Sequence, residues 1–196
     1  LEVIEIYSEP GKPLDFNAIE DAVVSNNAAA LAIVHSETSS GVLNPIAGVG
    51  EIAKQHNLIY IVDAVSSAGG AEIRMDEWGI DLLCTGSQKC LGSLAGLAPV
   101  AVSGRMWNIF DGRKTIPQSF FFDLSRWRKM WFPKEKGGEL IFGYHRQPMT
   151  MATHLIYAID EAVRLVLEEG KENRFRRHTT ASKAVRAGTF ITPPGP

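Results

Sequence analysis

The sequence predicts an α/β fold with a mostly parallel sheet flanked by helices, and two observations support it. Short apolar runs alternate along the chain with helical patterns. The runs at 59–63 and 80–85 each end in a polar cluster, at Asp63 and at Ser87-Gln88-Lys89. If these strands are neighbours in one sheet, their carboxyl ends share the edge where open α/β sheets bind ligands. The sequence therefore predicts that an acid and a lysine face one crevice.

The strands are expected from the apolar pattern at residues 3–7, 29–34, 58–62, 80–85 and 97–103. The first alternates apolar and acidic side chains and is expected to be half-exposed, whereas the second is a continuous apolar run and is expected to be buried. Small residues around Gly92 and Gly96 let the chain turn before the last strand. That strand is therefore expected to return antiparallel across the sheet.

Helices are expected at residues 15–25, 46–56, 105–110, 151–169 and 172–187, with one helical turn at 75–78. Asp15 can cap the first helix, and Pro45 suits the first turn of the second. Apolar residues recur at helical spacing in the fourth, which Gly170 ends. The fifth carries four basic side chains that we interpret as a solvated face, namely Arg174, Arg176, Arg177 and His178.

The stretch from 113 to 140 interleaves aromatic and basic residues. Such a pattern can bind single-stranded nucleic acid, but the chain is slightly acidic and shows no nucleic-acid motif. We expect the aromatic side chains, Phe120 to Phe122, Trp127 and Trp131, to pack on the core or at a subunit interface. Residues 134–138 are expected to form an exposed loop tip.

Composition narrows the function classes. The chain has 196 residues, 45% of them hydrophobic, and a formal net charge of −2, which argues against a general nucleic-acid partner. No apolar run reaches the length of a membrane span, and no signal peptide is visible. Cys84 and Cys90 make neither a disulfide framework nor a zinc site, and His145 and His154 lack ligand partners at suitable spacing. We expect a reducing, cytoplasmic location and no membrane partner.

A lysine beside a sheet edge can form a Schiff base with an aldehyde. A nearby carboxylate can keep a pyridine nitrogen protonated, which is what pyridoxal phosphate needs to act as an electron sink. Residue types alone leave ordinary alternatives open, because most lysines are solvated charges and most strand-end aspartates cap a turn. A dinucleotide-binding Rossmann domain is disfavoured, since no Gly-x-Gly-x-x-Gly follows a strand.

Four linked segments, in order and spacing, carry a resemblance to a known family: residues 36–45, 62–67, 78–81 and 85–89. Together they resemble the class V aminotransferases, the pyridoxal-phosphate group that includes serine–glyoxylate, alanine–glyoxylate and serine–pyruvate aminotransferases. The resemblance implies an aspartate-aminotransferase-like (fold type I) large domain. It implies transfer of an amino group from a small amino acid, serine or alanine, to a small 2-oxo acid, glyoxylate or pyruvate.

The resemblance also assigns roles. Lys89 would hold the cofactor as its Schiff-base lysine and act as general acid and base, and Asp63 would keep the ring nitrogen protonated. Thr38 would lie near the ring hydroxyl and Val65 against the ring face. Gln88 can donate a hydrogen bond to the cofactor phosphate. Thr150 aligns with a threonine that reaches the phosphate of the neighbouring subunit's cofactor, which implies a homodimer. Gln147 departs from the family, because relatives often have a phosphate-contacting tyrosine near this position.

Set beside the family, the chain is expected to be a fragment. Residues 1–170 would be a partial cofactor-binding large domain, and 171–196 a helix and tail leading towards a small C-terminal domain. The family's phosphate-binding loop would precede residue 1. Losing most phosphate donors, at roughly 1.5–3 kcal/mol per charge-assisted bond, would weaken cofactor binding by several kcal/mol.

Two alternatives to a working transaminase therefore remain. One is an isolated fragment without catalytic activity. The other is a different class V enzyme, such as a cysteine desulfurase or a lyase. Desulfurases usually have a histidine before the cofactor lysine, so Gln88 favours the transaminase branch.

Overall fold

The computed structural model describes residues 2–132 and 147–191. In these residues the strands β1 (Ala30–Val34), β2 (Ile59–Asp63), β3 (Leu82–Cys84) and β4 (Val100–Val102) form one sheet in the order β1-β2-β3-β4. β2 pairs in parallel with both β1 and β3, and β4 pairs antiparallel with β3. The predicted mostly parallel sheet with a returning last strand is confirmed, with β3 and β4 shorter than expected.

The register places the ends of the parallel strands at one level. Val34 is opposite Asp63 in the β1–β2 pair, and Asp63 is opposite Cys84 in the β2–β3 pair. The chain leaves all three strands at this carboxyl edge. The segments that follow Val34, Asp63 and Cys84 therefore start side by side.

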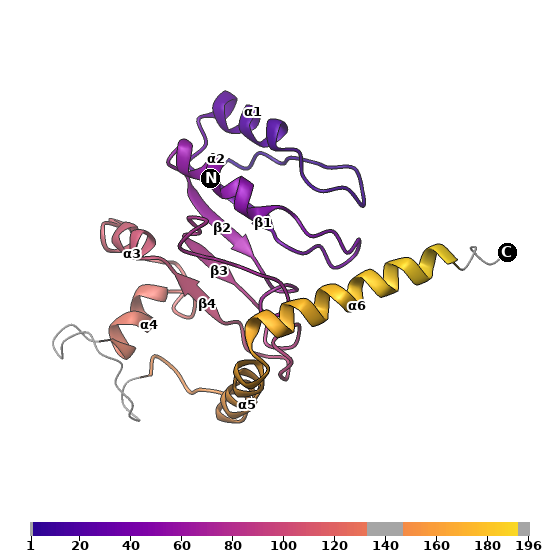
Figure 1. Cartoon of the computed structure of the whole chain (residues 1–196). Coiled ribbons are helices and arrows are strands. Elements are labelled where there is room, and N and C mark those ends of the chain that lie inside the picture. The colour runs from indigo at the N-terminus through magenta and orange to yellow at the C-terminus, as the bar shows by residue number, and fades with distance from the viewer. Residues whose placement is uncertain (1, 133–146, 192–196) are drawn as a thin grey trace.

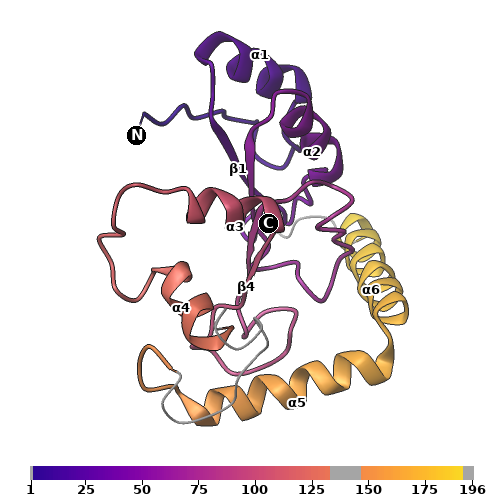
Figure 2. The same cartoon turned by 90° about the vertical axis from the view of Figure 1, so that its left-hand side faces the viewer.

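Six helices accompany the sheet in the described residues: α1 (Phe16–Asn26), α2 (Ile46–Gln55), α3 (Gly104–Asp111), α4 (Leu124–Trp131), α5 (Thr153–Glu169) and α6 (Lys171–Ile191). Figure 1 shows α1 and α2 at one end of the molecule and α5 at the other, with α6 projecting away from the sheet. The turned view in Figure 2 shows the same separation of α1 and α2 from α5. No described helix combines the length and the apolar character that a membrane crossing requires.

The core lies where α1 and α2 pack on the sheet. Tyr60 of β2 is fully buried, and its hydroxyl donates to Ile46 O of α2 at 2.8 Å. The N-cap of α1 is Asp15, as predicted, with Oδ1 accepting from Asn17 N at 2.9 Å. Gly50 lets α2 approach the turn at 75–79, because a Cβ there would lie 2.2 Å from Trp78 O.

Two strand predictions need correction. Residues 3–7 form no strand, because in the described structure β1 pairs only with β2 and no neighbouring backbone bonds this segment. Ile6 instead packs as a partly buried side chain against the core. β1 is also less buried than its apolar run predicts, since it lies at the edge of the described sheet. Ile33 is its one buried residue, and Val34 remains 37% exposed.

The aromatic residues between 113 and 132 pack mainly on one another. Edge-to-face pairs join Phe121 to Trp127 and Trp127 to Trp131, with centroids 6.0 and 5.4 Å apart, and Arg126 stacks over Phe120 at 4.1 Å. None of these rings belongs to the buried core cluster, so the prediction of core packing is wrong. The alternative, a subunit interface, stays a prediction. The expected loop tip at 134–138 lies outside the described residues.

Candidate active site

Three loops meet at the carboxyl edge of the sheet, and hydrogen bonds beyond the strands hold them in register. His35 N donates to Asp63 O at 2.8 Å, which joins the loop after β1 to the end of β2. Ala64 N donates to Cys84 O at 2.8 Å, which joins the loop after β2 to the end of β3. The predicted meeting of these strand ends is therefore present in the backbone.

Asp63 ends β2 with a half-buried side chain. Its Oδ1 accepts a hydrogen bond from Val65 N at 2.8 Å, which is the turn-capping contact typical of a strand-end aspartate. A carboxylate has about four acceptor sites, so one backbone bond leaves capacity for a ligand. The hydrogen bond from Val65 N holds the Asp63 side chain in place and does not neutralise its carboxylate.

Lys89 is exposed, but a buried serine anchors the loop that carries it. Ser87 is fully buried; its Oγ donates to Leu94 O at 2.5 Å and accepts from Leu97 N at 3.2 Å. Gly92, with φ of 78°, donates its N–H to Lys89 O at 2.9 Å. Nothing in the sequence distinguished Ser87 from the rest of the polar cluster at 87–89. The lysine thus extends from a fixed turn.

Gln88 and Val65 come together around Gly86. A Cβ at Gly86 would lie 3.0 Å from Gln88 Oε1 and 3.3 Å from Val65 Cγ1. Glycine at this position therefore leaves room for both side chains. Asp63, Val65 and Gln88 form one neighbouring set, linked by the Asp63–Val65 hydrogen bond on one side and by Gly86 on the other.

An open cavity of about 450 Å³ adjoins this set and brings Lys89 and Thr38 together. Thr38 Oγ1 lies 2.7 Å from Ser66 Oγ, which follows Val65 in the chain. Asp63, Val65 and Gln88 are not among the residues that line the cavity. Its wall consists of Ser36, Glu37, Thr38, Gly41, Ser66, Lys89, Cys90, Gly92, Arg174, Arg177 and His178.

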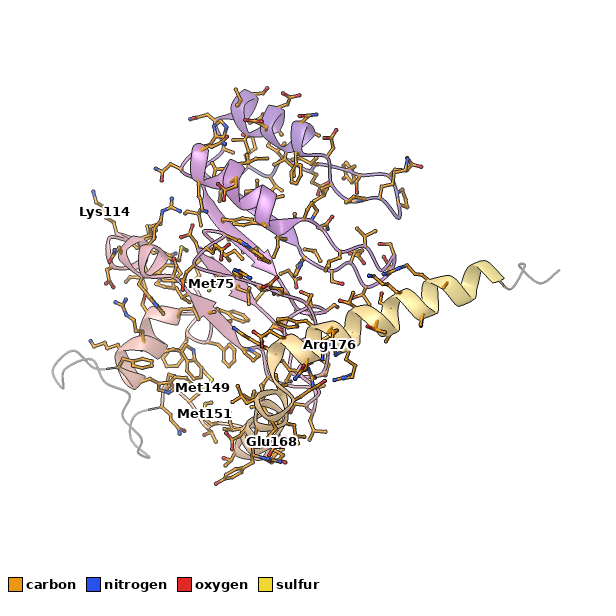
Figure 3. All side chains as sticks on the ribbon, viewed as in Figure 1. Met75, Lys114, Met149, Met151, Glu168 and Arg176 are labelled. Atoms are coloured by element: carbon orange, nitrogen blue, oxygen red, sulfur yellow. The ribbon has the colours of Figure 1, made fainter. Side chains whose placement is uncertain are left out.

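Thr150 is not brought to this cavity. It is exposed and stands between Met149 and Met151, in the segment that enters α5. Figure 3 shows both methionines in the lower part of the molecule, between α4 and α5. Five of the predicted site residues therefore form two adjoining sets. Thr38 and Lys89 line the cavity, and Asp63, Val65 and Gln88 lie next to it. Thr150 is separate from both sets.

The α6 wall corrects the sequence interpretation of a solvated basic face for Arg174 and His178, whereas Arg176 is exposed as predicted. The side chain of Arg174 is only 13% exposed, and Arg177 and His178 line the cavity although Arg177 remains 56% exposed. Sequence patterning missed them because α6 is strongly polar, and no apolar stripe marks the face that it turns to the loops.

The charges around the cavity are mostly positive. Arg177 and Arg174 hydrogen-bond to Glu169 and lower the pKa of its carboxyl to about 2. Burial, reinforced by the charges of Arg177 and Arg174, lowers the pKa of His178 below its usual value. Glu37 is the acid of the wall, and hydrogen bonds from Ser39 lower the pKa of its carboxyl. A cavity with Lys89 and Arg177 on its wall favours a ligand that carries negative charge.

The cysteines have ordinary packing environments. Burial, with the nearby charge of Asp63, raises the pKa of the Cys84 thiol, so little thiolate forms there. Cys90 Sγ lies 3.3 Å from Ser66 O. Both are free in the structure, and no group of three or more His, Cys, Asp or Glu suited to a metal ion occurs in the described ranges.

Residues 1–108 match the family described as aminotransferase class-V, which is more than half of the chain. The chain belongs to the class V aminotransferase family. An uncharacterized aminotransferase of Methanocaldococcus jannaschii is 37% identical over 188 residues, 95% of this chain and 46% of that protein. The (S)-ureidoglycine–glyoxylate transaminase of Bacillus subtilis is 36% identical over 176 residues, 81% of this chain and 40% of that protein.

The fold is likewise that of a class V aminotransferase. The structure of alanine–glyoxylate aminotransferase from Nostoc sp. matches with a TM-score of 0.79 at 33% identity, covering 89% of this chain and 44% of that one. The chain thus spans less than half the length of these relatives. The predicted family and the fold type I architecture are both confirmed.

Membership of the family implies pyridoxal phosphate as cofactor, and the residues present suit it chemically. An amine and a hydroxyl, those of Lys89 and Thr38, share the cavity, and a carboxylate with spare acceptor capacity ends the adjacent strand. Gly86 keeps the space between Val65 and Gln88 free of a Cβ. An amine, a hydroxyl and a carboxylate are the kinds of group that can bind the aldehyde, the ring hydroxyl and the pyridine nitrogen of this cofactor.

Proposed function

We propose that this chain carries the lysine-bearing part of a transaminase, which moves an amino group from a small amino acid to a small 2-oxo acid. Serine or alanine would be the donor, and glyoxylate or pyruvate the acceptor. The observation that carries the proposal is the pairing of Asp63 and the Lys89 loop on neighbouring parallel strand ends beside one cavity. Relatives named for glyoxylate support the choice of acceptor.

Pyridoxal phosphate, when bound, supplies a protonated pyridine ring that can take up the electron pair left when the substrate Cα loses its proton. In our proposal Lys89 is the residue that would hold the cofactor, through Nζ at its aldehyde. The same Nζ would serve as the general base and acid that takes up and gives back the proton of the substrate Cα. Asp63 would keep the ring nitrogen protonated, because a carboxylate favours a neighbouring cation.

Three further residues would hold the cofactor. The hydroxyl of Thr38, which the contact with Ser66 holds in place, would bond the ring hydroxyl. Val65 would pack on the ring face, and the Gln88 amide would donate to the phosphate. The cationic α6 wall would attract the negatively charged cofactor and substrates.

We also propose that the protein works as a cytoplasmic homodimer in which Thr150 contacts the phosphate bound by the neighbouring subunit. Thr150 is exposed and remote from its own chain's cavity, which suits a contribution to another one. Both cysteines are free, in keeping with a reducing compartment. Gly170, with φ of 79°, separates α5 from α6 and supports a division at residue 170 between a partial large domain and a connecting helix.

The test is cofactor capture at Lys89. The purified chain is mixed with pyridoxal phosphate, its visible absorption is recorded, and the product is reduced with borohydride and mapped by peptide. We expect a yellow species and a reduced label on Lys89. Lys89→Arg keeps the charge but cannot form the imine, so it is expected to lose both signals. Lys54, which bonds Glu51 and Glu77 O far from the cavity, is the internal reference for non-specific labelling.

The second half of the test is the reaction with substrates. Alanine or serine added before reduction should lower the label on Lys89 and convert the aldehyde form of the cofactor to the amine form, and glyoxylate should reverse this. No label on Lys89 would contradict the cofactor site in this chain. A label with release of sulfide and alanine from cysteine, but no amino transfer, would assign a desulfurase instead.

A further inference from the structure

Arg174 stands in the first turns of α6, and its guanidinium is directed to the loops at the carboxyl edge. Nε donates to Gly69 O at 2.8 Å, and Nη2 donates to Cys90 O at 2.7 Å. Gly69 belongs to the loop that follows Asp63, and Cys90 is the residue after Lys89. One side chain thus bonds both loops that carry the proposed chemistry. Figure 1 shows the first turns of α6 beside these loops.

The two loops are packed tightly where Arg174 bridges them. A Cβ at Gly69, whose φ is 86°, would lie 3.3 Å from Cys90 O. A Cβ at Gly70 would lie 2.6 Å from Cys90 Sγ, which itself lies 3.3 Å from Ser66 O. The contact therefore leaves little room for a side chain on the Gly69-Gly70 segment. A shift of either loop would therefore displace the other.

Glu169, the last residue of α5, holds the guanidinium from the other side. Its Oε2 accepts from Arg174 Nη1 at 3.0 Å, while Arg177 Nε donates to its Oε1 at 2.6 Å. A guanidinium has donors in a rigid plane, so three bonds in three directions fix both its position and its orientation. The backbone carbonyls that it holds are fixed in turn.

We propose that Arg174 is a positioning residue for Lys89: by bonding Gly69 O and Cys90 O together, it sets the separation of the Lys89 loop from the Asp63 loop. The inference rests on the proposed function, since the amine being positioned is the one that captures the cofactor. Without Arg174 the two carbonyl oxygens lose a shared charged donor. The Lys89 loop then samples positions in which Nζ and the Asp63 carboxylate no longer meet one ring.

The experiment measures the rate at which pyridoxal phosphate and borohydride label Lys89 in matched variants of the chain. Arg174→Ala removes the bridge, and Arg174→Lys keeps the charge without the planar fork. Arg176→Ala is the matched control, because Arg176 is exposed on the same helix and bonds Asn173 within it. Asp15→Ala removes the cap of α1 and lowers stability without touching either loop. Thermal midpoints are recorded for all.

We expect Arg174→Ala to label Lys89 at least about tenfold more slowly than the unmodified chain, because two charge-assisted hydrogen bonds are lost. Arg174→Lys should not recover the rate, since an ammonium cannot span both carbonyls with the same geometry. Arg176→Ala and Asp15→Ala should label at the original rate. Millimolar guanidinium chloride should restore labelling in Arg174→Ala, whereas sodium chloride at equal ionic strength should not.

Labelling of Arg174→Ala at the original rate would overturn the inference. So would an equal slowing in Asp15→Ala at the same loss of thermal midpoint, because the effect would then follow stability alone. If Arg174→Ala does not fold, Arg174→Lys decides: an unchanged rate overturns the proposal, and a slower one at an unchanged midpoint supports it. Absence of the Lys89 label in the unmodified chain would instead refute cofactor capture by this chain, and this inference with it.

Discussion

Ser87 shows how one residue governs the lysine loop. Its hydroxyl donates to Leu94 O and accepts from Leu97 N, closing the turn that presents Lys89. Ser93, in the same loop, also has a buried hydroxyl, but no hydrogen-bond partner in the structure satisfies it. Two serines with the same side chain therefore have opposite energetic roles within one turn.

Replacing Ser87 by alanine is expected to lower the free energy of unfolding by about 1–3 kcal/mol, because two loop backbone groups lose their partner. The matched change Ser93→Ala should be neutral or slightly stabilising, since it removes a buried unsatisfied hydroxyl. Urea unfolding of both variants, followed by circular dichroism, measures the difference. Equal effects of the two substitutions would mean that the Ser87 hydrogen bonds add nothing to stability.

At the scale of elements, two glycines of α2 lie where neighbouring segments approach the helix closely: Gly48 faces α1, and Gly50 faces the turn at Trp78. A Cβ at Gly48 would meet the ring of Phe16 on α1 at 2.6 Å, whereas a Cβ at Gly50 would meet the backbone oxygen of Trp78 at 2.2 Å. Phe16 is 40% exposed and its ring can turn aside, but the Trp78 carbonyl is fixed by its own turn. The two glycines thus have the same helix context and different neighbours.

This contrast predicts opposite outcomes for one substitution at two sites. Alanine gains up to about 1 kcal/mol over glycine in a helix interior. Gly48→Ala should therefore leave stability unchanged or raise it. Gly50→Ala should lower the free energy of unfolding by about 1–3 kcal/mol, because α2 must move off the turn at Trp78. Thermal and urea unfolding of the two variants check the sign, and a stabilised Gly50→Ala would contradict a close approach of α2 to the Trp78 carbonyl.

The stability of the whole molecule should depend on pH through His35. Its side chain is 3% exposed at the end of β1, its Nδ1 has no hydrogen-bond partner, and burial lowers its pKa from 6.5 to about 4. The unfolded chain binds the proton more readily than the folded one. The contribution of neutral, buried His35 to the free energy of unfolding is therefore fully present above about pH 6.5. It is lost as the pH falls from 6.5 towards 4, because protonation then favours the unfolded chain. His178, whose pKa is also lowered, acts in the same direction.

We expect the free energy of unfolding to fall by up to about 3 kcal/mol between pH 7 and pH 4, following roughly 1.4 kcal/mol per pKa unit. His35→Gln, which cannot titrate, should flatten most of this slope while lowering stability at pH 7. Urea titrations at several pH values provide the measurement. An equally steep pH dependence in His35→Gln would show that other groups cause it.

The sequence by itself determined the local parts of this protein. Apolar runs that end at Asp63 and at Ser87-Gln88-Lys89 predicted neighbouring strand ends. This was possible because a buried strand is recognised from the apolar side chains of a few consecutive residues. The class V family followed from segments in which the spacing is local too. The predicted strand at residues 3–7 is absent because a strand also needs a neighbouring backbone to pair with, and the pattern of its own residues does not supply one.

Only the tertiary structure decided what α6 does. Arg174 looked like a solvated charge, yet it bonds carbonyl oxygens 105 and 84 residues earlier in the chain. Every residue has a backbone carbonyl, so the residue types at the accepting positions do not indicate that an arginine binds there. The same holds for Gly50 against Trp78 O. Contacts to backbone atoms across long separations depend on how helices dock on loops, and that docking is a property of the assembled fold.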